Sequence, residues 1–205
     1  MTTVKIILMT KDEPDLIEGF IHHHGRIFGY NNLHIIDDST EESVLEFYTK
    51  NKDLGFNVYR FEGSNLNNLE HRINQIKDQI KNDCDFIIKL DTDEFILSYD
   101  KQSGSVVTDY EKILNSFNSI DRNTCHTTLA MSPVAEKNLP PLRFTRFSLP
   151  AYSRYRKCIF PTRSNLYIDL GGHGWGHNAK KSNVIIVHFH FQNLESWKKN
   201  NRKVL

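Results

Sequence analysis

A repeated pattern constrains the fold of this chain more than any other feature: a short apolar run, an acidic segment, then apolar residues at helical spacing. The apolar runs cover residues 4–9, 33–36 and 86–90, and carboxylates follow each of them closely. Between them, residues 16–28 and 66–80 repeat apolar side chains at intervals of three and four. Strands that alternate with helices indicate an α/β fold. We therefore predict a Rossmann-like, mainly parallel sheet with helices on both faces.

The second half of the chain has a different pattern, in which short strand-like runs are separated by proline and glycine. These runs lie at residues 125–131, 142–149, 157–160 and 184–191. Residues 102–108 have the composition of a loop, and residues 194–203 that of a terminal helix. We expect a small mixed or antiparallel C-terminal extension of the first sheet. No linker divides the sequence, so we predict a single domain over residues 1–205.

Composition argues against several classes of function. The chain has 205 residues, with 26 Lys and Arg against 25 Asp and Glu, and the net charge of +1 argues against a nucleic-acid-binding protein. No apolar run approaches the ~20 residues that a membrane span needs. The three cysteines are far apart and form no CxxC pair, which suits a reducing compartment. We therefore expect a cytoplasmic protein with no nucleic-acid partner and no membrane span.

The acidic segments should meet at one edge of the sheet. In an open α/β sheet, ligands bind beyond the carboxyl ends of the strands, where residues 10–13, 37–40 and 91–94 lie. Carboxylates that converge repel one another unless a cation or hydrogen-bond donors compensate them. A divalent metal is the simplest compensation, so the sequence predicts a metal site at this edge.

The segment Asp91-Thr92-Asp93 is the sharpest feature of that edge. On an extended segment, residues i and i+2 point the same way, so the two aspartates can share one hard cation. Such a cation can also hold the oxygens of a diphosphate. The alternative is a solvated turn in which Asp93 or Glu94 caps a helix.

Histidines and lysines near the C-terminus form a second candidate cluster. His188 and His190 share one face of a predicted strand, and neutral imidazole suits Mn²⁺ or Zn²⁺. We expect His188 to complete the metal site, although two hydrogen-bonded strand histidines are the alternative. Lys198 and Lys199 either contact phosphate or form a solvated basic face.

Two further segments carry histidine. Four glycines in residues 171–177 predict a mobile loop, in which Trp175 serves as a lid or sugar-stacking platform, or else as an apolar anchor. On a helix, residues 22–24 point in three directions, so these three histidines cannot bind one metal. We expect His24 to be a packed, hydrogen-bonded core residue.

Five elements in order resemble the glycosyltransferases of the GT-A fold, in their family-2-like and family-92-like branch. These are a K-N-E-like element at residues 11–13, an E-W-x-x-Y-H-like pattern at 18–24, a Y-D-N-x-S-T-like element at 36–40, D-x-D-E-F at 91–95, and an H-Y-H-Y-R-S-like end from 188. The chain departs from the pattern at Asp12 and Asp38, which replace asparagine, and at Gln192-Asn193, which replace a basic residue and serine.

The resemblance implies transfer of a sugar, as by a hexosyltransferase, from a nucleotide diphosphate sugar to a hydroxyl of a glycan or protein. The implied cofactors are Mn²⁺ or Mg²⁺ and a donor that is most commonly a UDP-sugar. The implied nucleotide contacts are Thr10, Lys11, Glu13 and Asp37, with Asp91 on the ribose or metal. The implied metal ligands are Asp91, Asp93 and His188. Residues 1–98 then form the nucleotide-sugar-binding half, and residues 99–205 the acceptor-binding half with the metal-ligand strand.

An inverting transferase also needs a carboxylate base for the acceptor hydroxyl. Asp169 is our candidate, with Glu136 as another and His173 as a second catalytic candidate in the glycine-rich loop. Two rival functions remain: a metal-dependent phosphohydrolase, and a catalytically silent nucleotide- or sugar-binding domain. The chain could also be one domain of a longer polypeptide.

Overall fold

The computed structural model describes residues 2–61, 66–131, 156–173 and 178–189. Several predictions lie outside these ranges: the strand at 142–149, the helix at 194–203, and the residues Glu136, Trp175, His190 and Lys199. No helix in the described ranges is both long and apolar enough to cross a bilayer.

Four parallel strands form the first part of the sheet. They are β1 (Val4–Thr10), β2 (Leu33–Asp37), β3 (Asn57–Arg60) and β4 (Phe86–Asp91), in the order β3-β2-β1-β4. The strands β1, β2 and β4 are buried along almost their whole length, as expected for parallel strands covered on both faces. The predicted Rossmann-like start of the fold is confirmed.

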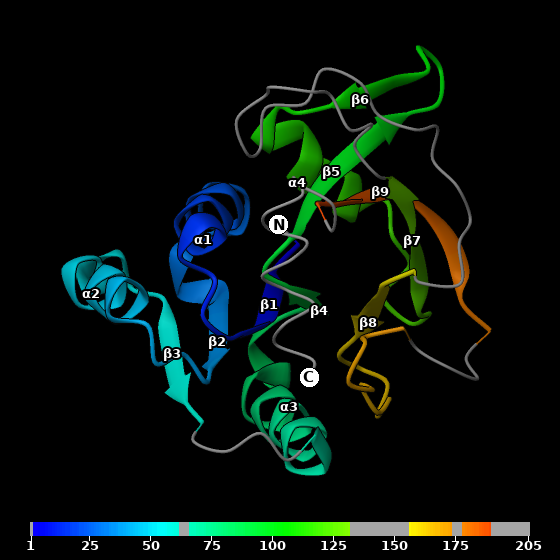
Figure 1. Ribbon diagram of the computed structural model, residues 1–205. Coiled ribbons are helices and arrows are strands. Elements are labelled where there is room, and N and C mark those ends of the chain that lie inside the picture. The colour runs from blue at the N-terminus through cyan, green and yellow to red at the C-terminus, as the bar shows by residue number, and fades with distance from the viewer. Residues whose placement is uncertain (1, 62–65, 132–155, 174–177, 190–205) are drawn as a thin grey trace.

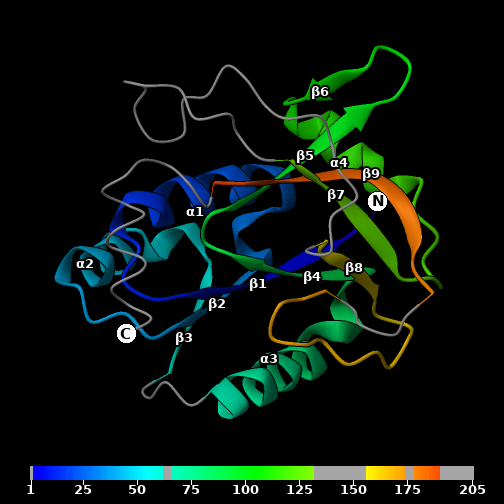
Figure 2. The same ribbon diagram turned by 45° about the vertical axis from the view of Figure 1, so that its right-hand side comes forward.

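Helices cover both faces of this sheet (Figure 2). They are α1 (Pro14–Phe28), α2 (Glu42–Lys50), α3 (Leu66–Ile80) and α4 (Tyr110–Asn118), with short 3₁₀ turns at Tyr30–Asn32, Lys52–Leu54 and Lys81–Asp83. Apolar residues of α1, α2 and α4 belong to one core cluster, while α3 packs into a second cluster on the opposite face. Helix α4 is an element that the sequence analysis did not predict.

The rest of the sheet is mixed (Figure 1). Strands β5 (Glu94–Asp100), β6 (Ser105–Val107), β7 (His126–Met131), β8 (Cys158–Pro161) and β9 (Lys180–His188) extend it in the order β4-β8-β7-β9-β5-β6. Among the described strands, four pairings are parallel and four antiparallel. The predicted mixed or antiparallel extension is therefore present, with β4–β8, β8–β7, β9–β5 and β5–β6 antiparallel. It is larger than the predicted small extension, so the described sheet as a whole is mixed and the prediction of a mainly parallel sheet is wrong.

The predicted loop at residues 102–108 also differs from the structure. Its residues 105–107 form β6, which pairs antiparallel with β5 in a hairpin. The turn between the two strands includes Gly104 at φ +68°, in the left-handed region that glycine adopts readily. The glycine and its polar neighbours are typical of a turn. The strand after them was not predicted because it is only three residues long.

Two histidines of α1 satisfy the backbone of β5. His24 is fully buried; its Nε2 accepts the N–H of Ile96 at 3.2 Å, and its Nδ1 lies 2.9 Å from the carbonyl oxygen of Phe20. The Nε2 of His23 lies 2.8 Å from the carbonyl oxygen of Ile96. Side chains of α1 thus bond the backbone of Ile96, two residues before the pairing of β5 with β6 begins at Ser98. The prediction that His24 is a packed, hydrogen-bonded core residue is confirmed.

We predict that the free energy of unfolding falls as the pH drops below about 6.5. Burial, with the neighbouring His23, holds the pKa of His24 well below its usual value, so below about pH 6.5 the unfolded chain binds more protons than the folded one. Urea unfolding at about pH 7.5 and about pH 5.5 measures the loss.

The variant His24→Gln keeps hydrogen-bonding groups but cannot titrate. It should lower stability by about 1–2 kcal/mol near neutral pH and show a smaller loss between the two pH values than the natural protein. An equal pH dependence in both proteins would show that His24 does not contribute to it.

Candidate active site

The carboxyl ends of three parallel strands lie in register at one edge of the sheet. Thr10 at the end of β1 pairs with Asp37 at the end of β2, and Met9 pairs with Asp91 at the end of β4. The structure therefore brings together the segments that follow these strands, as the sequence predicted.

Two buried lysines compensate Asp91. The Nζ of Lys89 contacts one carboxylate oxygen of Asp91, and the Nζ of Lys157 lies 2.8 Å from the other. Both lysine side chains are 1% exposed, whereas that of Asp91 is 37% exposed. Burial raises the pKa of Asp91, but the two ammonium groups outweigh it and lower the pKa to about 2. Asp91 is thus an ionised, partly exposed carboxylate at the edge of the sheet, and the two buried lysines fix its position.

Glu94 closes the turn that follows β4. Its Oε2 accepts the backbone N–H of Asp91 at 2.9 Å and lies 2.9 Å from the Nζ of Lys157. The same Nζ donates to the carbonyl oxygen of Gly171 at 2.7 Å. Burial raises the pKa of Glu94 and lowers that of Lys89, while Asp91 and Glu94 raise the pKa of Lys157 despite its burial. Sequence reasoning missed both lysines, although a lysine inside the apolar run FIIKL signals a buried carboxylate partner.

Asp93 and His188 face each other beside this cluster. The Oδ2 of Asp93 lies 3.1 Å from the Nε2 of His188, and the N–H of Phe189 donates to the carbonyl oxygen of Asp93 at 2.8 Å. Pairing of Glu94 with His188 between β5 and β9 sets this position. Burial opposes protonation of His188, but the neighbouring carboxylates, Asp93 first, raise its pKa overall. Two of the three predicted metal ligands are therefore adjacent.

Asp37 lies within a buried network. Its carboxylate is fully buried, accepts hydrogen bonds from Ser39 at 2.6 Å and Tyr48 at 3.2 Å, and forms an ion pair with Arg60. The guanidinium of Arg60 also donates to the carbonyl oxygen of Ser39 at 2.7 Å, and its side chain is 43% exposed. Sequence reasoning identified Asp37 but not these three partners, which come from separate elements.

The segment after β1 is held by the segment after β2. Asp12 has φ 50°, a left-handed conformation that aspartate and asparagine tolerate best, and its Oδ1 accepts the N–H groups of Thr40 and Glu41 at 2.7 and 2.8 Å. The Nζ of Lys11 lies 2.8 Å from Asp38 Oδ2. These bonds explain how aspartate serves at position 12, where the resembled family has asparagine.

Thr10 and Glu13 flank that segment. Thr10 is buried, and its hydroxyl has no hydrogen-bond partner among the described residues. Glu13 is the residue before α1, and its carbonyl oxygen accepts the N–H groups of Leu16 and Ile17 at 3.2 and 3.0 Å. A buried hydroxyl without a partner at the predicted nucleotide cleft is a group that a ligand can satisfy.

Asp169 and His173 belong to one turn next to β8. The Oδ1 of Asp169 accepts the N–H of His173 at 3.0 Å, and the Nδ1 of His173 lies 3.0 Å from the carbonyl oxygen of Arg156. The carbonyl oxygen of Gly172 accepts the N–H of Cys158 at 2.8 Å. The turn is thus fixed to Arg156 and Cys158, which flank Lys157. Glu136 and Lys199, the other base candidate and the predicted phosphate contact, lie outside the described residues.

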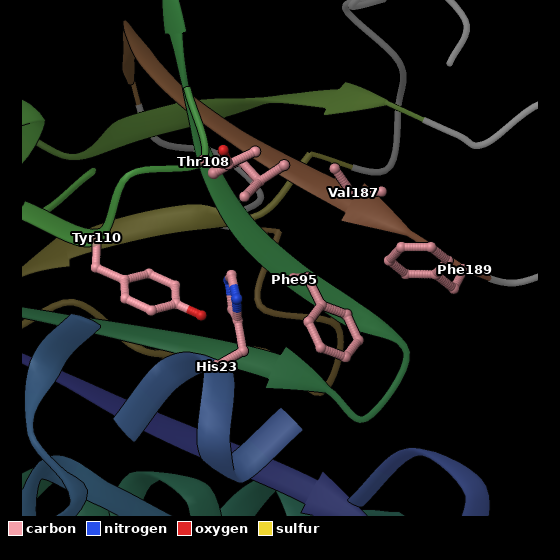
Figure 3. A pocket seen from close by; sticks show the side chains of 7 residues that line it. His23, Phe95, Thr108, Tyr110, Val187 and Phe189 are labelled. Carbon is pink, nitrogen blue, oxygen red and sulfur yellow. The ribbon is translucent and has the colours of Figure 1, made fainter. Parts of the chain in front are cut away.

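A pocket of about 290 Å³ opens between α1, β5, β9 and the start of α4 (Figure 3). Its lining is mainly apolar and consists of His23, Phe95, Leu97, Thr108, Tyr110, Val187 and Phe189. Phe95 directly follows Glu94, and Phe189 directly follows the predicted metal ligand His188. Because side chains alternate along a strand, Phe95 faces α1 whereas Glu94 faces Lys157, so the pocket opens on the α1 side of β5. Sequence reasoning did not find this pocket.

A scan against protein families and a search of curated proteins give no match to this sequence. The fold is similar to that of S. aureus TarS, with a TM-score of 0.54 over 92% of this chain and 35% of that chain, at 15% identity. TarS 1-349 in complex with UDP gives a TM-score of 0.52 over 91% of this chain and 57% of that chain, at 14% identity. Mannosyltransferase PcManGT from Pyrobaculum calidifontis, in complex with GDP-Man and Mn²⁺, matches 65% of this chain and 35% of that chain at a TM-score of 0.39 and 13% identity.

The likeness to TarS concerns the fold. This chain spans between 35% and 60% of the length of the TarS structures that it matches.

We predict that Arg60→Met lowers the free energy of unfolding by about 3 kcal/mol, because it leaves the buried charge of Asp37 without its ion-pair partner. Denaturant unfolding followed by circular dichroism measures the change. The matched control is Lys50→Met, which breaks an exposed pair with Glu46 and should cost less than about 0.5 kcal/mol. Adding Asp37→Asn to Arg60→Met should recover part of the loss, and no recovery would contradict the assignment of the loss to the buried charge.

Proposed function

We propose that this chain is a metal-dependent glycosyltransferase domain that takes a sugar from a nucleotide diphosphate sugar, with a UDP-sugar as the proposed donor. The observation that carries the proposal is the turn from Asp91 to Glu94 with His188 beside it, at the carboxyl edge of a sheet that resembles TarS. Three of the five motifs of the resembled family follow β1, β2 and β4 at this edge, and His188, the first residue of a fourth, lies beside Asp93. We further propose that residues 1–98 bind the donor and residues 99–205 the acceptor.

The residues present fit a divalent metal. A carboxylate oxygen of Asp93 and the Nε2 of His188 lie 3.1 Å apart, and carboxylate with imidazole is a donor set that suits Mn²⁺. Within the described ranges, no group of three or more His, Cys, Asp or Glu side chains gathers as a metal site. Two protein ligands suffice when water and substrate phosphates fill the other positions, as is usual for Mg²⁺. When bound, the metal offsets charge on the diphosphate leaving group.

Asp91 serves a different partner in this proposal. Each of its carboxylate oxygens already contacts an ammonium group, and these two positive charges repel an approaching divalent cation. A ribose hydroxyl has no such conflict, because it donates a hydrogen bond to an ionised acceptor. We therefore propose Asp91 as the ribose acceptor and place the metal on Asp93 and His188.

The nucleotide cleft is proposed along the ends of β1 and β2. The hydroxyl of Thr10 and the side chains of Lys11 and Glu13 border it, and the ammonium group of Lys11 carries the charge that a diphosphate attracts. Asp37 is fully buried, so it acts in this proposal through Arg60, whose guanidinium is partly exposed.

Transfer breaks the bond between the anomeric carbon and the diphosphate and forms a bond to an acceptor hydroxyl, with an oxocarbenium-like transition state as in glycoside hydrolysis. Asp169 is proposed to accept the hydroxyl proton, with His173 next to it in the same turn. One oxygen of Asp169 holds the N–H of His173, which fixes the direction of the carboxylate. The acceptor is proposed to be a hydroxyl of a glycan or protein.

We predict that Asp93→Asn weakens Mn²⁺-dependent binding of UDP at least about tenfold, because it removes the charged metal ligand and leaves the ribose acceptor in place. Isothermal titration calorimetry with UDP, in Mn²⁺ or in a chelator, measures the affinity. The melting temperature should stay within a few degrees of the natural value, since the carbonyl oxygen of Asp93 still accepts from Phe189.

The matched control is Asp78→Asn, an exposed aspartate on α3, which should bind UDP as the natural protein does. Unchanged UDP affinity in Asp93→Asn would remove Asp93 from the site. Binding of Mn²⁺ alone, with none of any nucleoside diphosphate, would favour a metal-dependent phosphohydrolase. Nucleotide binding without turnover of any nucleotide sugar would favour a silent binding domain.

A further inference from the structure

Lys157 occupies an unusual place for a lysine. It lies next to the start of β8, its side chain is 1% exposed, and its ammonium group meets three acceptors from two separate turns. These are Asp91 Oδ2 at 2.8 Å, Glu94 Oε2 at 2.9 Å and the carbonyl oxygen of Gly171 at 2.7 Å. An ammonium group has three protons, so these three contacts account for all of its donors.

The three acceptors belong to the two turns that the proposed reaction uses. Asp91 and Glu94 bracket the turn that carries the metal ligand Asp93, here called the donor turn (residues 91–94). Gly171 lies in the turn of residues 169–173 that carries the candidate base Asp169, here called the base turn. The ammonium group of Lys157 therefore bonds both turns at once.

A glycine in the base turn allows it to lie close to β4. Gly172 has φ +67°, and a Cβ there would lie 3.0 Å from the carbonyl oxygen of Lys89. Glycine thus lets the base turn approach the backbone of β4 closely, next to the residues that lead into the donor turn. The close approach and the Lys157 contacts both keep the base turn beside the donor turn.

We propose that Lys157 is a positioning residue for glycosyl transfer, which holds the donor turn and the base turn at a fixed separation through its three hydrogen bonds. The inference rests on the proposed function and deepens it. Lys157 is buried, so it acts through Asp91, Glu94 and Gly171 and does not itself meet the substrate. Lys89 also contacts Asp91, and its aliphatic stem lies beside Gly172, but the hydrogen bond of its ammonium group goes to the donor turn.

The test compares variants in which the buried charge stays balanced. Lys157→Met alone leaves the carboxylates of Asp91 and Glu94 undercompensated, which endangers folding. We therefore combine Lys157→Met with Glu94→Gln, which removes one charge of each sign and keeps an oxygen to accept the N–H of Asp91. Glu94→Gln alone is the reference, and Lys77→Met is the matched control, because Lys77 is also mostly buried and donates to the carbonyl oxygen of Leu166.

Two quantities are measured at about 15 °C, where the folded state is favoured. The first is the affinity for UDP in the presence of Mn²⁺, by titration calorimetry. The second is amide hydrogen exchange in the donor turn and in the base turn. Circular dichroism confirms that each variant is folded.

We expect the double variant to bind UDP in the presence of Mn²⁺ about tenfold more weakly than Glu94→Gln does. Its backbone amides should exchange hydrogen faster in both turns, including the base turn, which carries no mutation. Lys77→Met should match the natural protein in both measurements. A second double variant, Lys157→Gln with Glu94→Gln, keeps a hydrogen-bond donor at position 157. Its UDP affinity should lie between those of Glu94→Gln and of the variant with Lys157→Met. A residue that merely stabilised the fold would lower the melting temperature and leave the affinity at low temperature unchanged.

Affinity equal to that of Glu94→Gln, or faster exchange confined to the donor turn, overturns the inference. Failure of the proposed function looks different: the natural protein then binds no nucleoside diphosphate with Mn²⁺. In that case the hydrogen-exchange data still test whether Lys157 holds the two turns together. Faster exchange of the double variant in both turns supports this role, and faster exchange in one turn alone contradicts it.

Discussion

The compensation of carboxylates at the end of β4 is the interaction on which the candidate site depends. Parallel pairing of β1 with β2 and β4 places acidic segments side by side, where like charges repel. Lys89 in β4 and Lys157 beside the start of β8 offset this repulsion, and their own burial is tolerable because Asp91 and Glu94 pair with them. The turn that follows β4 therefore takes its shape from buried ion pairs that belong to the core.

Local patterns were sufficient to predict the first half of the fold. Strands such as β1 and β4 are continuous apolar runs and α1 is amphipathic, so short windows of sequence carry their signal. The mixed half depends on pairings between distant segments, such as β9 with both β5 and β7, which periodicity does not encode. The sequence analysis predicted a mixed or antiparallel extension but underestimated its size, because β5 and β6 contribute to it as well as the later strands.

The sequence likewise predicted part of the candidate site. The motif positions indicated that Asp93 and His188 would meet, and the structure places them 3.1 Å apart. The side chains that hold Asp37 and Asp91 were not found, because Arg60 and Lys157 lie 23 and 66 residues away from them along the chain. A charged residue in an apolar strand shows that a partner exists, but its identity depends on the tertiary fold.

The aspartates at this edge of the sheet differ in their positively charged neighbours. Asp37 is neutralised by Arg60 and removed from solvent, and Asp91 is neutralised by two lysines but remains at the rim. Neither arrangement favours a divalent cation, because each carboxylate already has cationic neighbours. Asp93 instead faces an imidazole, which is a metal ligand when neutral. The two aspartates of the D-x-D segment are therefore not equivalent, and the lysines that make them differ are contributed by β4 and by the segment leading into β8.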